Sequence, residues 1–575
     1  MRRVRSTRFA VAARRRSPHH RRGSVLLVVL VIVLLLTFGV YGFTERMLAE
    51  KAAASAHGSA AQARASADSG VALAASLVDA GNLDPAAPPP LYHEPGAFRG
   101  VTLAGVPGQP GASRFTVFAP VVTDPAGRLI RHGLTDESGK WDVNGLLDLK
   151  RNGETLTPEE QRNLLLGLPG MTRDIADAIL DYVDADSEPR TYGAEADAYA
   201  ALQPPRLPRD GPLTSIDELL LVRGVTPQLL YGEDANRNGL LDPAENDGPA
   251  TAPADNADGV LNRGWTGSLT VHGGEPNLRG DGTPKIDLND GILTDLFDAL
   301  EEEFDAEIAT FVVAYRLAGP TDPENSADTV DATTDVPSDE EPTEDEAAAR
   351  AGPSESEEKQ IDEAAGALAK LLGGNTEGAV TRAGMDLSGG AEFDLGSFYD
   401  LVGREVEVEI EGQKTTLSSP FQSSGLLDAL PDILDRVTVF DTSLIRGRVN
   451  VNQASEAVLL GIPGMPAELP AQIAGTPMIG PGGEARGDLW AARRTPFWLV
   501  AEGLCDLPTL RRLDAFLTCR GGFFRVQSVG YTDGGGPAVR VEAVIDGTTV
   551  PARVVEMRDL SDLGRGVPRA ILDGP

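Results

Sequence analysis

The sequence predicts an α+β fold, in which an N-terminal transmembrane helix continues into a domain of one helix and antiparallel strands that carries inserted helical modules. Three observations predict this fold. Residues 24–43 form an apolar run of about the 20 residues that a helix needs to cross a bilayer. Strand-like segments stand towards both ends of the remaining chain, in 98–145 and 521–550. Between them, a hairpin pattern with Pro-Gly-Met at its turn occurs twice, in 164–171 and 459–465.

The apolar run follows a strongly basic leader. Residues 1–22 contain nine arginines and no aspartate or glutamate. Dense positive charge before a single span keeps that end of a chain in the cytoplasm. We therefore expect everything after Phe43 to be exported.

The junction between the leader, residues 1–23, and the apolar run, residues 24–43, is distinctive. No cleavage site of the A-x-A kind follows the run at once, which argues against an ordinary secretory signal. A basic leader that ends in glycine before an apolar helix resembles type IV prepilins and type II secretion pseudopilins. The resemblance implies that a prepilin peptidase cuts after Gly23 and that the new terminus, Ser24, is N-methylated. An uncleaved signal anchor is the alternative.

Charge and composition exclude several classes of function. The net charge is −35, and removal of the leader takes away nine positive charges and no negative one, which leaves −44. Such an acidic chain does not suit nucleic-acid binding, which needs a basic surface. Nucleotide-binding and hydrolase motifs are absent, and the four histidines outside the leader are scattered. We therefore expect a protein that is not an enzyme.

Residues 44–145 are expected to form a pilin-like helix and its first strands. The stretch from Thr44 to about Ala80 is dominated by alanine, which has the highest helix propensity. Residues 114–122, 128–134 and 140–144 follow as strand-like segments with turn residues between them.

Helical modules are expected in 146–265 and in 393–520. The two Pro-Gly-Met hairpins, and a looser copy in 219–225, resemble helix-hairpin-helix (SAM-like) modules. Short extended motifs that end in asparagine also repeat, in 140–144, 285–289 and 448–452; the second of these opens a strand and helix segment in 266–320. Such repetition indicates duplicated modules. Hairpins of this kind can hold phosphate through backbone amides, but the aspartates beside the first hairpin would repel it, which favours a structural role.

The acidic residues are concentrated in one segment. Residues 321–360 contain fourteen acidic and two basic residues, a composition that cannot form a core. We expect an acidic disordered insert over 321–392. The chain then closes with a β-hairpin in 521–550, the last strands of the pilin sheet, and a tail in 551–575.

The order of these features is more specific than any one of them. A prepilin leader, a pilin-like start, Pro-Gly-Met hairpins, the acidic phrase in 181–189 and the closing strand in 524–530 occur together. In this order they look like the K-type minor pseudopilin of the type II (general) secretion system. The resemblance implies a tip subunit that initiates or caps the periplasmic pseudopilus and supports export of folded proteins across the outer membrane. Its implied partners are the I-type and J-type minor pseudopilins. It also implies a single-pass protein of the inner membrane with its bulk in the periplasm.

The fifth position after the predicted cleavage site supports this resemblance. Most pilins and pseudopilins carry glutamate there, whereas this chain has Val28. A carboxylate at membrane depth costs a few kcal/mol unless it is paired, and in a pilin fibre its partner is the terminus of the subunit above. A tip subunit has no subunit above it, and the K-type family is known for lacking this glutamate.

A calcium site is predicted in residues 234–245. The segment matches the loop template D-x-[DN]-x-[DN]-G-x5-E at every fixed point. We expect Ca²⁺ to be held by six residues, of which the fourth contributes its carbonyl: Asp234, Asn236, Asn238, Leu240, Asp242 and Glu245. Pro243 inside the loop departs from a standard EF-hand, and a solvated loop of turn-forming residues is the alternative.

The two cysteines, Cys505 and Cys519, lie in the exported part. Disulfides persist in such compartments, and a loop of this length would gain roughly 3 kcal/mol from one. We therefore predict a disulfide, with two buried thiols as the alternative.

A second function is also compatible with the sequence: a minor pilin of a type IV pilus or DNA-uptake system, or a membrane-anchored adhesin. The duplicated modules favour the secretion subunit, because ordinary minor pilins are far shorter. Neighbouring genes for a secretion ATPase and an outer-membrane secretin would distinguish the two.

Overall fold

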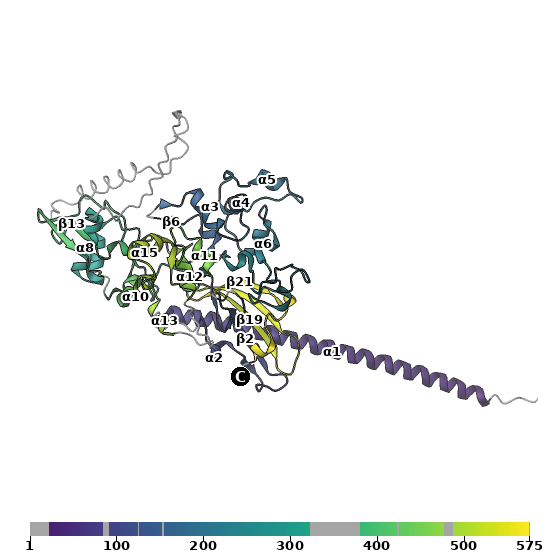
Figure 1. The fold of residues 1–575 in the computed structure, drawn as a ribbon. Helices are drawn as coiled ribbons and strands as arrows, with labels where there is room; N and C mark the ends of the chain where they lie inside the picture. The colour runs from purple at the N-terminus through teal and green to yellow at the C-terminus, as the bar shows by residue number, and fades with distance from the viewer. Residues whose placement is uncertain are drawn as a thin grey trace, which may run out of the picture. The chain divides into compact units, whose positions relative to one another are not determined.

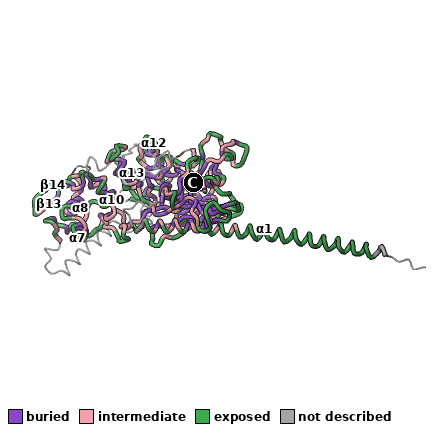
Figure 2. The backbone as a smooth tube through the Cα atoms, turned by 90° about the horizontal axis from the view of Figure 1, so that it is seen from below, coloured by how far each residue is buried: buried purple, intermediate pink, exposed green. Residues whose placement is uncertain are grey.

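The computed structural model describes residues 22–83, 91–122, 124, 126–151, 154–321, 380–422, 425–475 and 487–573. The chain divides into two compact units, residues 1–62 and 63–575, and helix α1 (Arg22–Leu83) contributes to both (Figure 1). In the first unit, residues 25–58 of α1 are exposed along the helix (Figure 2). This is the one helix in the described ranges that is long and apolar enough to cross a membrane. Of the predicted leader, residues 1–23, residues 1–21 lie outside the described residues.

The second unit is built on a seven-stranded sheet that joins strands from both ends of its chain. Its main path is β1-β2-β19-β20-β21, while β3 pairs with β2 and β4 with β19. All these pairings are antiparallel. β2 and β19 lie side by side, with Thr116 opposite Val529 (Figure 1). The strands are β1 (Val101–Ala104), β2 (Ser113–Pro120), β3 (Ile130–Arg131), β4 (Thr135–Asp136), β19 (Phe523–Thr532), β20 (Val539–Asp546) and β21 (Arg553–Asp559).

The second half of α1 packs on one face of this sheet through small residues. Ala63, Ala67 and Ala74 are fully buried there. The contact is so close that a Cβ on Gly530 of β19 would lie 1.9 Å from the carbonyl oxygen of Ala63. Alanine therefore serves two purposes in this stretch, since it favours the helix and lets the helix approach the strands.

Between β4 and β19, three two-residue strands each pair in parallel with a strand far along the chain. The pairs are β5 (Trp141–Asp142) with β8 (Leu269–Thr270), β10 (Ile286–Asp287) with β15 (Val437–Thr438), and β17 (Val449–Asn450) with β18 (Leu517–Thr518). The first strand of each pair lies in one of the three repeated motifs seen in the sequence. The three repeated sequence motifs therefore correspond to a repeated structural unit.

The same hydrogen bonds recur in the three pairs. In each first strand, a side-chain oxygen accepts from the backbone N–H of the motif's last asparagine, at 3.1, 2.9 and 3.0 Å. In each return strand, the threonine hydroxyl accepts from the N–H two residues later, at 3.2, 3.1 and 3.0 Å. These local turns explain the residue types in the motif, because Asp, Asn and Thr can bond the backbone two residues on.

Two helix pairs in the first module pack reciprocally through glycine turns. α3 (Pro158–Leu166) and α4 (Arg173–Val183) are joined at Gly170, and the short helices η3 (Ile216–Leu221) and α6 (Pro227–Tyr231) at Gly224. A Cβ on Gly170 would meet Leu229 of α6 at 2.7 Å, and one on Gly224 would meet Ile175 of α4 at 3.0 Å. The looser hairpin copy in the sequence is thus the packing partner of the first hairpin.

The second unit contains further helices and strands. A hairpin of β13 and β14 and a helix pair of α7 and α8 are the larger ones, with α8 against β13. Their bounds are α7 (Leu293–Glu303), α8 (Ala306–Ala318), β13 (Glu405–Ile410), β14 (Gln413–Ser418), α10 (Leu426–Arg436), α11 (Glu456–Leu460) and α12 (Leu469–Ala474). The shorter ones are α2 (Pro95–Phe98), β6 (Lys150–Arg151), β7 (Glu154–Thr155), α5 (Ala196–Ala200), β9 (Glu275–Pro276), β16 (Leu444–Ile445), α13 (Gly487–Ala492), α14 (Trp498–Ala501), α15 (Leu507–Leu513) and α16 (Arg569–Leu572).

Two expected segments differ from the structure. The acidic insert was assigned to 321–392, but β11 (Thr381–Arg382) and β12 (Met385–Asp386) form a hairpin in which Met385 is fully buried. The acidic bias has ended there, so apolar side chains are available to fold; residues 322–379 lie outside the described residues. The expected tail, 551–575, contains the edge strand β21 and helix α16.

Candidate functional site

The predicted calcium loop, residues 234–245, lies between α6 and the short helix η5 (Gly264–Gly267) and ends in the single turn η4 (Pro243–Glu245). Its fourth and sixth residues, Arg237 and Gly239, have positive φ angles of 58° and 71°. The template requires a sharp turn at the sixth position, where glycine carries little strain.

Side-chain oxygens of the loop accept hydrogen bonds from its own backbone. The carboxylate of Asp234 accepts from the N–H groups of Asn238 and Gly239, at 3.1 and 2.9 Å. The amide oxygen of Asn236 accepts from Asn238 N–H at 3.0 Å, and that of Asn238 from Leu240 N–H at 2.7 Å. These bonds close the loop around its first, third and fifth residues, three of the predicted ligands.

Glu245, the predicted ligand at the twelfth position of the loop, is buried, with 3% of its surface exposed. Its carboxylate accepts from the N–H groups of Ala235 and Asp242, at 3.0 and 3.1 Å. Burial, followed by the charges of Asp234 and Asp242, raises the pKa of Glu245 to about 7, although these hydrogen bonds act to lower it. Burial also raises the pKa of Asp234. The charges of Arg263 and Arg540 favour the ionised form of Asp234, but burial outweighs them.

The loop fits Ca²⁺ in donor type and backbone conformation, since its ligand candidates are all oxygens. Its carboxylates do not point at one common position. No group of three His, Cys, Asp or Glu side chains in the described part of the chain is arranged to hold a metal ion. Instead, the amide nitrogens of Asn236 and Asn238 donate to Asp242, at 2.6 and 2.9 Å. If a cation were bound, Asp234, Asn236, Asn238, Asp242 and Glu245 would hold it with side-chain oxygens and Leu240 with its carbonyl.

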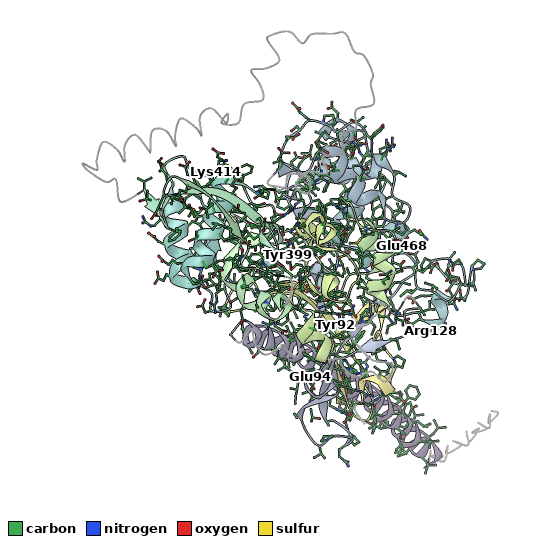
Figure 3. All side chains as sticks on the ribbon, turned by 60° about the vertical axis from the view of Figure 1, so that its left-hand side comes forward. Tyr92, Glu94, Arg128, Tyr399, Lys414 and Glu468 are labelled. Atoms are coloured by element: carbon green, nitrogen blue, oxygen red, sulfur yellow. The ribbon has the colours of Figure 1, made fainter. Side chains whose placement is uncertain are left out.

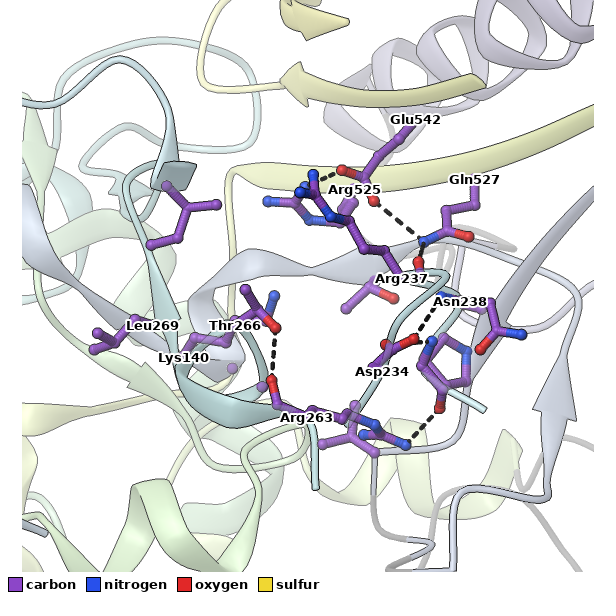
Figure 4. Close-up of a pocket in the computed structure, with 18 of the residues that line it drawn as sticks. Lys140, Asp234, Arg237, Asn238, Arg263, Thr266, Leu269, Arg525, Gln527 and Glu542 are labelled. Carbon is purple, nitrogen blue, oxygen red and sulfur yellow. Dashed lines mark hydrogen bonds and ion pairs between the residues drawn. The ribbon is translucent and has the colours of Figure 1, made fainter. Parts of the chain in front are cut away.

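Segments from three other parts of the chain converge on the loop. Gln527 of β19 donates to the carbonyl of Arg237 at 2.9 Å, and Arg540 of β20 donates to the carbonyl of Asn236. The amide of Asn238 donates to the carbonyl of Gly566 at 2.5 Å. A cavity of about 120 Å³ lies beside the loop and is lined by residues of the loop and of β19 and β20 (Figure 4). Sequence reasoning missed these partners, because none of them is near the loop in the chain.

A second buried polar cluster joins the sheet to the first strand pair. Glu137, which is fully buried, accepts from Lys140 at 3.1 Å and from the hydroxyl of Thr270 at 2.5 Å. Arg525 of β19 donates twice to Glu137 and once, at 2.8 Å, to Glu542. Burial alone would raise the pKa of Glu137, but Arg525 and Lys140 outweigh it and hold that pKa well below its usual value.

The expected disulfide does not form. Cys505 and Cys519 are both free and half-buried. Cys505 follows α14, whereas Cys519 directly follows β18, where the return strand places it next to Trp498 and Asn452. Burial raises the pKa of the Cys505 thiol to about 11 and that of the Cys519 thiol further, so both are unreactive thiols. The side chain of Tyr399, in the same module, is more deeply buried, while Lys414 stands at the surface of the β13–β14 hairpin (Figure 3).

The residues predicted for processing lie on α1. Gly23 and Ser24 fall in its first turn, and Val28 follows with 54% of its surface exposed. The helix begins at Arg22, before the predicted cleavage site.

Comparison with known proteins identifies the first helical module. Residues 139–231, from β5 to α6, match the family model of type II secretion system (T2SS) protein K. This module of the chain is therefore of the protein K type. The resemblance seen in the sequence is thereby confirmed, and protein K is a T2SS minor pseudopilin, a structural component rather than a known enzyme.

The other comparisons add little. The crystal structure of the GspK-GspI-GspJ complex from the enterotoxigenic Escherichia coli type 2 secretion system aligns at 10% sequence identity and a TM-score of 0.32, over 87% of this chain and 95% of that chain. No curated protein matches this chain.

Proposed function

We propose that this minor pseudopilin is the tip subunit of the periplasmic pseudopilus, which it initiates or caps, and that it thereby supports export of folded proteins across the outer membrane. The observation that carries the proposal is Val28, an exposed apolar residue on α1 at the position where most pilins have glutamate. A buried carboxylate in the membrane costs a few kcal/mol unless it is paired. A subunit with no neighbour above its helix gains nothing from that carboxylate.

The architecture of the second unit supports an end position. The sheet carries a long insertion, residues 137–522, between β4 and β19. A subunit that repeats along a fibre must leave room for the next copy on both sides. A subunit at the end needs to leave room on one side only. It can therefore carry inserted modules of this size on its other side.

The proposal includes partners and processing. We propose that a prepilin peptidase cleaves after Gly23, that Ser24 becomes the methylated terminus, and that α1 anchors the chain in the inner membrane with its bulk in the periplasm. The assembled partners are the I-type and J-type minor pseudopilins, as the family resemblance implies.

Co-purification tests this assembly. The full chain, extracted from membranes in detergent with tagged I-type and J-type subunits, should elute with both. A matched experiment replaces them with a major pseudopilin, which should not elute with the chain alone. If the chain were to bind the major subunit and neither minor one, the tip proposal would fall and a position within the fibre would replace it.

We also propose that residues 234–245 bind Ca²⁺ as a structural ion. The buried Glu245, with its pKa raised to about 7, supports this, because a cation would relieve the cost of its charge. The periplasm is open to extracellular calcium, so even the weak affinities of extracellular modules would suffice. Isothermal titration of the full chain with CaCl₂ tests the site: a Glu245→Gln variant should lose the binding heat, and an unmodified chain without any heat would refute the proposal.

A further inference from the structure

The last residues that the structure describes in the second unit, 564–573, lie back on the sheet, and we call them the C-terminal segment. The carbonyl of Leu572 accepts from the hydroxyls of Thr116 in β2 and Tyr531 in β19, at 2.8 and 2.7 Å. Val567 and Leu572 are 4% and 1% exposed. Two side chains of the segment are therefore anchored in the core, while residues 564, 565, 568 and 570 are exposed. Its only secondary structure is the four-residue helix α16.

The C-terminal segment and the calcium loop share one apolar cluster. Leu240, the seventh residue of the loop, packs in the cluster that holds Val567 and Leu572. Phe118, Val529 and Tyr531 of the sheet complete this cluster. A displacement of the loop backbone at Leu240 would therefore remove apolar contacts from the C-terminal segment.

Polar contacts tie the two more specifically. The side chain of Asn238 is fully buried: its oxygen bonds inside the loop, and its nitrogen donates to the carbonyl of Gly566 at 2.5 Å. Gly566, with a φ of +77°, passes so close to the buried Arg540 that a Cβ would lie 2.3 Å from Nη1. Arg540 in turn donates to the loop carbonyl of Asn236. One buried amide thus bonds the loop to the segment, and one buried guanidinium, bonded to the loop, packs against the segment.

We propose that the loop and the C-terminal segment form one cooperative unit, a latch in which a divalent cation in the loop fixes residues 564–573 on the sheet and its removal releases them. The inference rests on the proposed calcium site and extends it to the end of the chain. Asn238 is the link: its oxygen belongs to the predicted ligand set, and its nitrogen holds Gly566. Because coupling between two sites is reciprocal, release of the segment must also weaken cation binding.

Hydrogen exchange measured on the full chain in detergent tests the latch. With CaCl₂, backbone amides in 564–573 should exchange at least about tenfold more slowly than with a chelator, a coupling of ordinary size. Amides of the β13–β14 hairpin serve as the internal reference and should not change. Slower exchange in 234–245 without any change in 564–573 would overturn the latch and leave the calcium site standing.

A pair of leucine substitutions tests the reciprocal effect. Leu572→Ala removes a buried side chain of the C-terminal segment and replaces no predicted ligand; Leu460→Ala removes an exposed side chain of α11 as the control. By titration, Leu572→Ala should weaken calcium binding about tenfold, and Leu460→Ala should leave it unchanged. Equal affinities for the two variants would overturn the latch. Absence of calcium binding in the unmodified chain would overturn the calcium proposal and the latch with it.

Discussion

The guanidinium of Arg525 donates two hydrogen bonds, each 2.9 Å long, to the buried carboxylate of Glu137, which precedes it by 388 residues. This pair connects β19 to the turn that opens the first repeated motif. Removing one partner of a buried ion pair leaves an uncompensated charge, at a cost of about 3–5 kcal/mol. Arg525→Met should therefore lower the free energy of unfolding by about that amount in chemical denaturation.

A matched substitution separates this effect from loss of a long side chain. Arg553→Met changes an exposed arginine of the edge strand β21 and should cost less than about 0.5 kcal/mol. The double variant Glu137→Gln with Arg525→Met should be more stable than the sum of its single changes predicts. Strict additivity would mean that the two residues do not interact.

The pKa of Glu245 predicts how stability depends on pH. Its folded pKa, about 7, lies above the unfolded value of about 4.3, so the folded state binds the proton more tightly. Without calcium, stability should therefore fall as pH rises from about 4 to 7, by up to roughly 3 kcal/mol. Urea unfolding at each pH, with chelator, measures the slope.

Calcium and Glu245→Gln should each flatten that slope, because one compensates the charge and the other removes it. Arg237→Ala, which changes a loop residue outside the ligand set, should keep both the slope and the rise in melting temperature with calcium. Identical pH profiles for Glu245→Gln and the unmodified chain would show that another group carries the dependence.

Alanine substitutions at the hairpin glycines distinguish the stability cost of backbone strain from the cost of disturbed packing. Gly170 and Gly224 have positive φ and reach the facing helix, while Gly464, in the second Pro-Gly-Met hairpin, has positive φ and open space around it. Alanine at Gly464 should cost the strain alone, about 1–2 kcal/mol. Alanine at Gly170 should cost more in thermal unfolding, because the side chain of Leu229 must also move. Equal losses at the two sites would mean that the helix pairs do not depend on this contact.

Processing is predicted between Gly23 and Ser24. N-terminal sequencing of the protein from membranes should begin at Ser24, and a bulky substitution, Gly23→Leu, should leave the leader in place. Retention of Met1 in the unmodified protein would favour the signal anchor instead.

Val28→Glu tests the tip position. The new carboxylate would find no partner at a tip and should reduce assembly of pseudopili, counted by electron microscopy, whereas Val28→Ala should have no effect. Assembly that is unimpaired by Val28→Glu would argue that the subunit has a neighbour above it.

The sequence predicts the parts of the fold that local pattern determines. The alanine-rich helix, the strand segments near both ends and the repeated motifs all follow from propensity and spacing. The return strands β8, β15 and β18 were missed, because each has two residues and pairs with a strand more than 60 residues away. Their shared feature, an aliphatic residue followed by threonine, becomes visible once one pair is known.

The sequence predicts the candidate ligands of the calcium loop, but it does not predict the residues that pack around the loop. The template specifies residues 234–245, yet the partners that bury it, Gln527, Arg540 and Gly566, follow by about 290 residues or more. The predicted disulfide failed for the same reason, because spacing along the chain says nothing of where β18 places Cys519. The tertiary arrangement decides both.

The pairing of β2 with β19 has a consequence for biogenesis. A chain that emerges N-terminus first completes β2 while about 400 residues, up to Phe523, are still to come. Pairings between strands so distant in sequence form slowly, and an unpaired edge strand invites association with other chains. Completion of the sheet therefore requires that the chain has been made at least as far as β21, and a prematurely terminated product would retain an open edge at β2.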